Sequence, residues 1–156
     1  MKILFFHRWA GVHFGGTETH VVELMQRFSQ RGHQVSLLTR QGQRIGSFGQ
    51  GIKVYRVSKN LCESDHSYEN PVFLYLHTFL FMLKSFLYLL YLRIFLGQKY
   101  DLISVHFATE AIVARFFRLL FKIPYVFVLE GYTSLEATEA KLANSSIAIS
   151  EDMVKK

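Results

Sequence analysis

Residues 13–20 read His-Phe-Gly-Gly-Thr-Glu-Thr-His and connect an apolar run to an amphipathic stretch that begins near Thr17. The adjacent glycines Gly15 and Gly16 let the backbone turn sharply between a strand and a helix and approach a ligand closely. The start of the helix aims unpaired N–H groups and a partial positive charge at the same spot. The stretch therefore predicts an anion site suited to phosphate, and the alternative is a tight turn without a ligand.

The segments around this loop predict a βαβ unit. Lys2 to His7 is a short apolar run typical of a buried parallel strand. Thr17 to Arg31 has apolar residues at helical spacing and is followed by Gly32, so it predicts an amphipathic helix. His33 to Thr39 predicts a second strand. Arg40 to Gly51 carries four glycines without an apolar period and predicts a loop.

The rest of the chain continues the alternation of strands and helices. Further strands are expected at Ile52 to Val57, Asp101 to Phe107, Tyr125 to Leu129 and Ser146 to Ile149. Further helices are expected at Val72 to Leu96, Ala111 to Lys122, Leu135 to Ala143 and from Ser150 onward. The sequence thus predicts an α/β fold, with a Rossmann-like, doubly wound and mainly parallel sheet flanked by helices. The expected strand order is 3-2-1-4-5-6.

The helix expected at Val72 to Leu96 is apolar and long enough to span a bilayer, for which about 20 residues suffice. Polar groups line up along one side of it, among them His77 and Lys84. A lysine at the bilayer centre costs about 2.5–3.5 kcal/mol, which disfavours a span. The favoured interpretation is a helix buried against the sheet with a narrow polar stripe. A helix on a membrane surface and a span remain as alternatives.

The length and net charge of the chain limit the domain organisation and the kinds of ligand to be expected. The 156 residues suit a single domain, residues 1–156, and the 18 Lys+Arg against 12 Asp+Glu give a net charge of +6. This charge predicts attraction to phosphates, anionic lipid surfaces or nucleic acid, and nucleic acid is the weakest because no binding motif collects the cations. The single cysteine, Cys62, fits a reducing compartment. We expect no signal peptide, because the apolar run at residues 3–6 is too short for one.

Four motifs follow one another along the chain: Gly15 to Leu24 with Arg31 to Val35, Tyr100 to His106, Ile123 to Leu129, and Ala148 to Glu151. In this order they closely resemble the N-terminal domain of the retaining glycosyltransferases of the GT-B fold (glycosyltransferase family 4-like, group 1). The resemblance implies a complete enzyme with two Rossmann-like domains. Residues 1–156 would be its acceptor-side half, and the C-terminal donor-binding domain would be absent.

The resemblance also implies an activity. The complete enzyme would transfer a sugar from a nucleotide-sugar donor to a carbohydrate or lipid-linked acceptor, whereas these 156 residues alone would not turn over. We expect the nucleotide sugar as substrate, no tightly bound cofactor and no metal, since the chain has no Asp-x-Asp motif or His/Cys cluster. The expected partners are a donor domain in the same or another chain and the acceptor. The expected location is cytoplasmic.

Single residues are assigned by the same resemblance. Gly15, Gly16 and Thr17 would face the donor diphosphate. His106, at the end of the fourth strand, and Glu130, where the family usually has a histidine, are the expected catalytic residues that line the cleft. A core histidine is the alternative for His106, and a surface carboxylate at a strand end is the alternative for Glu130.

Trp9, His13 and Glu110 are the expected acceptor-binding residues. Trp9 and His13 lie in the first loop, and the alternative is that this loop rests on its neighbours. Glu110 follows the fourth strand, and its alternative is stabilisation of a helix dipole. Glu18 and His20 also match the family pattern, and His20 is expected to pack within the first helix.

A basic stripe raises a second hypothesis of peripheral contact with the inner face of a membrane. Arg115, Arg118 and Lys122 share one side of the helix expected at residues 111–122, opposite Phe116 and Leu119. Many members of the family act on lipid-linked acceptors at the cytoplasmic membrane surface. The stripe is otherwise a solvated face.

Two rival functions remain open. One is a stand-alone Rossmann-like module that binds a nucleotide or sugar phosphate without catalysis. The dinucleotide version is disfavoured because the first loop lacks Gly-x-Gly-x-x-Gly and the second strand ends at Arg40 without an acidic ribose partner. The other rival is a membrane-anchored interaction protein in which Val72 to Leu96 spans the bilayer.

Overall fold

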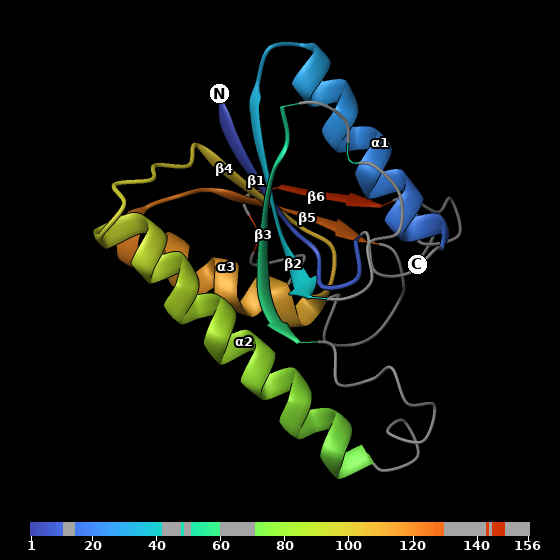
Figure 1. Cartoon of the computed structure of the whole chain (residues 1–156), viewed down its shortest axis with the longest axis vertical. Helices are drawn as coiled ribbons and strands as arrows, with labels where there is room; N and C mark the ends of the chain where they lie inside the picture. Colours follow the sequence, from blue (N-terminus) through green and yellow to red (C-terminus); the bar gives the residue numbers. More distant parts are fainter. Residues whose placement is uncertain are drawn as a thin grey trace.

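In the part of the chain that the computed structural model describes, six parallel strands form one sheet in the order β3-β2-β1-β4-β5-β6 (Figure 1). The strands are β1 (Lys2–Phe6), β2 (Gln34–Gln41), β3 (Lys53–Lys59), β4 (Leu102–Val105), β5 (Tyr125–Leu129) and β6 (Ser145–Ala148). The helices are α1 (Gly16–Gln30), α2 (Pro71–Ile94) and α3 (Ala108–Phe121). The structure describes residues 1–10, 15–41, 48, 51–59, 71–129, 143 and 145–148. The predicted strand order is confirmed.

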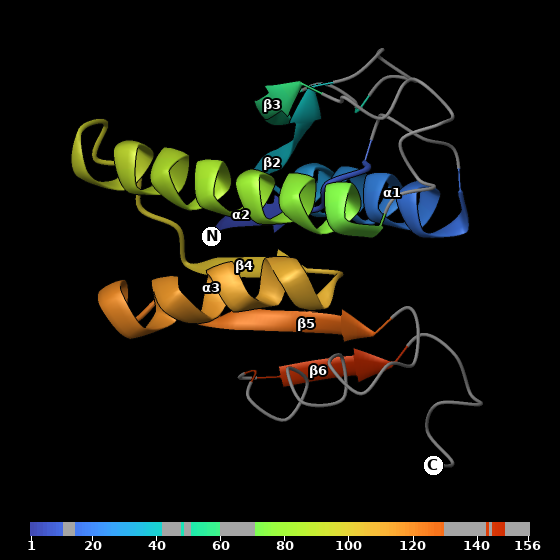
Figure 2. The ribbon, with the colours of Figure 1, turned by 90° about the horizontal axis from the view of Figure 1, so that it is seen from below.

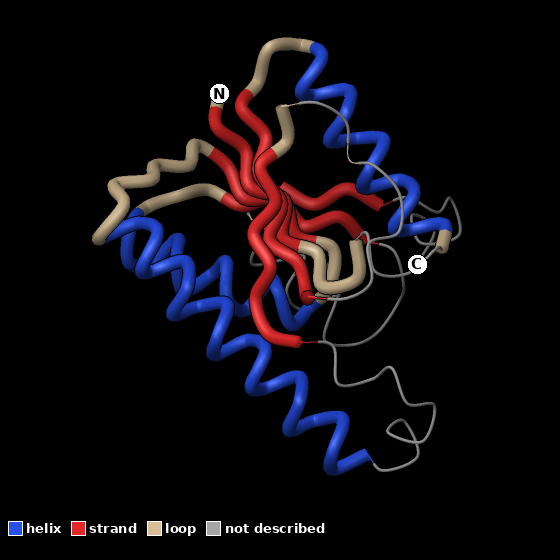
Figure 3. Tube along the Cα trace, in the orientation of Figure 1, coloured by secondary structure: helices blue, strands red, loops and turns tan. Residues whose placement is uncertain are grey.

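β1 separates two apolar cores, because successive side chains of a strand point to opposite faces of the sheet. Ile3 and Phe5 belong to the core that includes Met25 of α1. Leu4 and Phe6 belong to the other core, under α2 and α3. Figures 1 and 3 show α1 on one side of the sheet and the two other helices on the opposite side. The doubly wound α/β fold is therefore confirmed.

α1 occupies the segment predicted for it. Its N-cap is Gly15, and Val21 and Met25 are buried at the helical spacing that the sequence shows. Gly32 follows the helix with a φ of +80°, a conformation that favours glycine over residues with a side chain.

α2 packs on the sheet along one side only (Figure 2). Its buried side is formed, at helical spacing, by Phe81, Ser85, Leu89 and Leu92. The expected contact with the sheet is confirmed for this side, but the remaining surface of the helix is largely apolar and exposed instead of a narrow polar stripe. The stretch Tyr75–Ile94 is long and apolar enough to cross a membrane by length and composition, and 22% of it is buried.

α3 begins three residues earlier than predicted, at Ala108. Glu110 then lies in its first turn, where a carboxylate interacts favourably with the helix dipole. Phe116 and Leu119, placed by the sequence on the side away from the basic stripe, are exposed, because Phe117 occupies the core position.

The end of β2 also differs from the expected one. β2 continues through Gln41, into the segment that was expected to be a loop, and pairs there with β3 after a register shift. The helices expected at residues 135–143 and from residue 150 onward lie outside the described residues, apart from Ala143.

Candidate functional site at the carboxyl edge of the sheet

The carboxyl ends of β1 and β4 lie side by side in the middle of the sheet. The chain continues from β1 to α1 on one face and from β4 to α3 on the other. Such a point, where the strand order reverses, is where open α/β sheets bind ligands. His7 follows β1 and His106 follows β4, so the fold brings two histidines to this edge.

His106 is completely buried. Its Nε2 lies 3.4 Å from the hydroxyl oxygen of Ser104, and its ring packs on Phe5 with the ring centroids 6.5 Å apart. A core histidine was the expected alternative, and the burial fits it. The catalytic role of His106 stays a prediction.

His7 is a second buried histidine, 5.3 Å from His106 between ring centroids, which sequence analysis missed. The backbone N–H of Trp9 donates to its Nδ1 over 3.2 Å, so the neutral ring carries its proton on Nε2. That Nε2 has no hydrogen-bond partner among the described residues. Burial first, and then His106 and Arg8, lower the pKa of His7 well below its ordinary value, so the ring is neutral at pH 7. A polar residue at the end of an apolar strand was the signal available in the sequence.

Glu110 is completely buried, and Arg8 and Thr109 donate hydrogen bonds to its carboxylate. The backbone N–H and the Nε of Arg8 donate to Oε1 over 3.2 and 3.0 Å, and the Thr109 hydroxyl donates to Oε2 over 3.2 Å. The guanidinium of Arg8 also donates to Thr109 and lies 4.9 Å from the ring centroid of Phe107. The ion pair thereby ties the segment after β1 to the first turn of α3. Contact between Glu110 and an acceptor stays a prediction.

Trp9 lies against a buried cation. The guanidinium of Arg40, at the end of β2, is 4.8 Å from the Trp9 ring centroid and 4.7 Å from that of Phe81. The Thr39 hydroxyl donates to the backbone oxygen of Ala10 over 3.0 Å and holds the same segment. Trp9 thus rests on its neighbours, as the alternative had it, and sugar stacking stays a prediction. Arg40 was missed as a site residue because the sequence placed it in a loop.

The N-terminus of α1 already has a carboxylate beside it. A Cβ on Gly15 would collide with a carboxylate oxygen of Glu18, whereas a Cβ on Gly16 would meet nothing within 4 Å. Thr19 donates to the Gly15 carbonyl through its N–H and its hydroxyl, over 3.0 and 2.8 Å. Thr17 is half-buried in the first turn. The predicted anion site at Gly15, Gly16 and Thr17 did not allow for this resident negative charge.

Two predicted site residues, His13 and Glu130, lie outside the described residues. Within the described part of the chain, no group of three His, Cys, Asp or Glu side chains is placed to hold a metal ion. The edge that is described therefore combines two buried histidines, one buried ion pair, a buried arginine and a helix N-terminus.

Comparison of folds places the chain among glycosyltransferase structures. It superimposes on sucrose-phosphate synthase from Thermosynechococcus elongatus (TM-score 0.56, 15% identity, 83% of this chain and 33% of that one). It also superimposes on MurG from Acinetobacter baumannii (TM-score 0.56, 15% identity, 94% of this chain and 40% of that one). A third match is the apo form of the lipopolysaccharide outer core galactosyltransferase WaaB (TM-score 0.57, 18% identity, 99% of this chain and 41% of that one). The chain thus spans about a third to two fifths of these structures, and at this identity the likeness shows the fold.

Comparison of sequences identifies the family. No curated protein matches the chain significantly in sequence. The model of the glycosyl transferase 4-like domain matches residues 15–149, which is most of the chain and includes the glycine pair, β4 and β5. With this match and a Rossmann-like sheet that superimposes on the GT-B enzymes, the chain belongs to the glycosyl transferase 4-like domain family.

Proposed function

We propose that this domain is the acceptor-binding half of a retaining glycosyltransferase that transfers a sugar from a nucleotide-sugar donor to a carbohydrate or lipid-linked acceptor. The family match supports the reaction class, and the partial coverage of the structural neighbours supports a second, donor-binding domain. That domain would belong to the same polypeptide or to a partner. The nucleotide sugar would be a substrate, no metal or tightly bound cofactor would be needed, and the location would be cytoplasmic.

The observation that carries the proposal is the convergence of His7, Arg8, His106 and Glu110 at the β1/β4 edge. Ligands of open α/β sheets bind at this edge, and buried ionisable groups hold the segments around it in place. Neutral His7 adds no charge beside His106. His106, together with Glu130, is the proposed catalytic lining of the cleft.

The reaction breaks the bond between the anomeric carbon and the donor diphosphate, forms a bond from that carbon to the oxygen of an acceptor hydroxyl with the same configuration, and releases the proton of that hydroxyl. The diphosphate leaves with additional negative charge, which backbone N–H groups at a helix N-terminus stabilise. Gly15, Gly16 and Thr17 are proposed to supply those groups. Because the carboxylate of Glu18 lies beside Gly15, the arriving diphosphate would repel it and displace this side chain toward solvent.

The test compares His106→Ala and His106→Gln with His33→Ala in the full-length protein. His33 is half-buried and precedes β2, at the opposite edge of the sheet. Transfer from a panel of UDP- and GDP-sugars to cell-envelope acceptors is measured as kcat/KM, with circular dichroism to establish folding. We expect a loss of about 100-fold for both His106 variants and less than twofold for the control. Binding of a nucleotide sugar without any transfer by the wild type would favour a stand-alone binding module instead.

A further inference from the structure

Exposed apolar side chains gather on two helices. Among the described residues, every exposed large hydrophobic side chain except that of Met1 lies on α2, on the two residues after it, or on α3. On α2 they include a stripe with a spacing of three or four residues: Leu76, Leu80, Leu83, Leu87, Tyr91 and Ile94. On α3 they are Phe116, Leu119 and Leu120. We call the stripe on α2 together with these three residues of α3 the α2–α3 face.

The core of the domain does not use this face. The side of α2 that packs on the sheet, with Phe81, Leu89 and Leu92, points away from the stripe because the two sets lie about half a helical turn apart. A helix that packs on a sheet by one side normally turns a polar side to water. An apolar patch of this extent on a soluble surface marks an interaction site.

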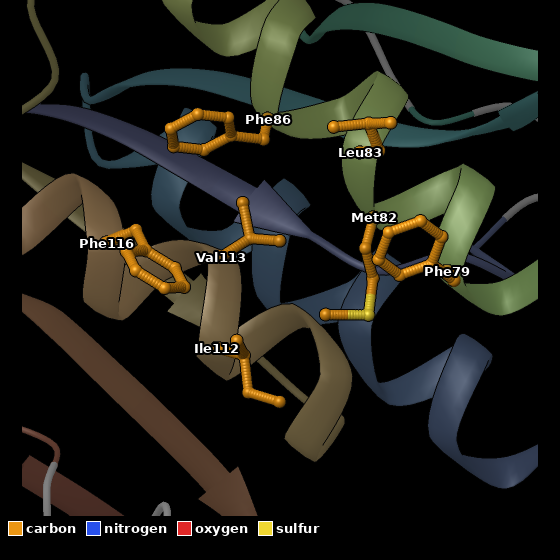
Figure 4. Close-up of a pocket in the computed structure, with 7 residues that line it drawn as sticks. All are labelled: Phe79, Met82, Leu83, Phe86, Ile112, Val113 and Phe116. Carbon is orange, nitrogen blue, oxygen red and sulfur yellow. The ribbon is translucent and has the colours of Figure 1, made fainter.

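A groove between the two helices belongs to the same surface. It encloses about 220 Å³ and is lined only by apolar residues, among them Leu83 and Phe86 of α2 and Phe116 of α3. Figure 4 shows the side chains of both helices around it. Its lining offers no hydrogen-bonding side chain, so it suits a hydrocarbon group and not a polar ligand.

On the described residues of α2 and α3, the exposed charged side chains are all positive. Residues 71–100 contain no Asp or Glu, and the single acid of α3, Glu110, is buried against Arg8. Lys84 on α2 and Arg115 on α3 are exposed, as is Lys122 directly after α3. An apolar surface fringed by cations complements anionic lipid headgroups above hydrocarbon chains.

Two other occupants fit these observations less well. A second copy of the chain would bring the cations of one face toward those of the other, with no exposed acid on either helix to compensate. Spanning a bilayer would remove Phe81, Leu89 and Leu92 from the core that they form with the sheet. Binding parallel to a membrane surface preserves that core and covers the exposed stripe.

We propose that the α2–α3 face binds the surface of a membrane that contains anionic lipids, with α2 lying in the plane of the interface. The stripe on α2 and the exposed residues of α3 enter the acyl region, and Lys84, Arg115 and Lys122 contact phosphate headgroups. The proposal concerns an interaction surface and does not depend on the transfer reaction.

The experiment measures partition of the full-length protein onto vesicles of phosphatidylcholine alone and of phosphatidylcholine with phosphatidylglycerol, without any sugar donor. We expect binding to the anionic vesicles that is at least tenfold stronger and that falls with added salt. The double variant Leu76→Glu with Leu87→Glu should lose at least tenfold in partition. Its control, Gln30→Glu with Gln34→Glu, adds the same two charges at exposed positions outside the α2–α3 face and should stay within twofold.

A second pair isolates the charges. Lys84→Gln should weaken binding to the anionic vesicles about fivefold, and Arg31→Gln, which removes an exposed cation next to α1, should leave it within twofold. Equal binding by wild type and the double leucine variant would overturn the proposal. So would a wild-type dimer in solution that the double leucine variant dissociates, because a second copy would then cover the face. Resistance of the membrane-bound protein to alkaline extraction would overturn it in favour of a span.

Discussion

The ion pair between Arg8 and Glu110 provides a quantitative test of how the candidate site is held together. Glu110→Ala removes the carboxylate and leaves the Arg8 guanidinium, whose side chain is 14% exposed, without its counter-charge. Breaking a buried pair from one side costs about 3–5 kcal/mol. Because Arg8 keeps some contact with water and with the Phe107 ring, we expect about 3 kcal/mol. For a domain of this size that corresponds to a fall in Tm of about 6–12 °C.

Urea unfolding followed by circular dichroism measures this cost. The matched control is Glu23→Ala, which removes an exposed pair with Arg27 at 2.5 Å and should cost less than about 0.5 kcal/mol. Replacing both buried partners, as Arg8→Met with Glu110→Leu, should recover most of the loss, since no uncompensated charge remains. A cost for Glu110→Ala no larger than that of the control would refute the buried-pair reasoning.

Three further outcomes are expected. Acidification below pH 6.5 should destabilise the protein through His7, because the lowered pKa of this residue in the folded state lets the unfolded chain bind the proton first. Relative to the His7→Gln variant, the free energy of unfolding of the wild type should fall by up to about 1.4 kcal/mol per pH unit. Parallel pH profiles of the two proteins would contradict this. Phe117→Ala should lower the free energy of unfolding in urea by about 3–5 kcal/mol and Phe116→Ala by less than about 1 kcal/mol, because the first side chain is 2% exposed and the second 53%. Similar losses for the two variants would contradict the assignment of Phe117 to the core. Gly16→Val in the full-length protein should keep its circular dichroism spectrum and lose transfer activity, because the added side chain meets open space at a proposed phosphate loop, and unaltered turnover would exclude that role.

The strands were predictable because their apolar runs alone specify burial. Lys2 to Phe6 has no polar residue after its first position, and in a sheet covered on both faces such a run has only one interpretation. α2 was harder, because its periodicity cannot tell which apolar side meets the sheet. The buried Ser85 lies on the core side and the exposed Leu83 does not, so hydrophobicity by itself does not identify the side of α2 that meets the sheet.

The candidate site could be predicted only in part, because its chemistry depends on contacts between distant segments. The family resemblance assigned His106, at the end of the fourth strand, whereas its neighbour His7 matches no motif. The proximity of the two histidines becomes apparent only when β1 and β4 pair. The ion pair between Arg8 and Glu110 joins residues that are 102 positions apart in the sequence, and no local sequence pattern predicts it. Glu18 at the start of α1 follows a local rule that the sequence already contained, the preference of carboxylates for helix N-termini.

In the described part of the chain, β3 has a strand partner on one side only, since it stands at the end of the six-strand order. Its outer N–H and C=O groups have no strand partner within the described residues, and such a row is a template onto which a strand of another chain can add. Lys53 and Arg56, both exposed on β3, oppose this: an identical strand arriving there would meet two positive charges with two of its own. These two cations, which contribute to the positive net charge, therefore disfavour the addition of another copy of β3 to this edge of the sheet and the assembly of larger sheets.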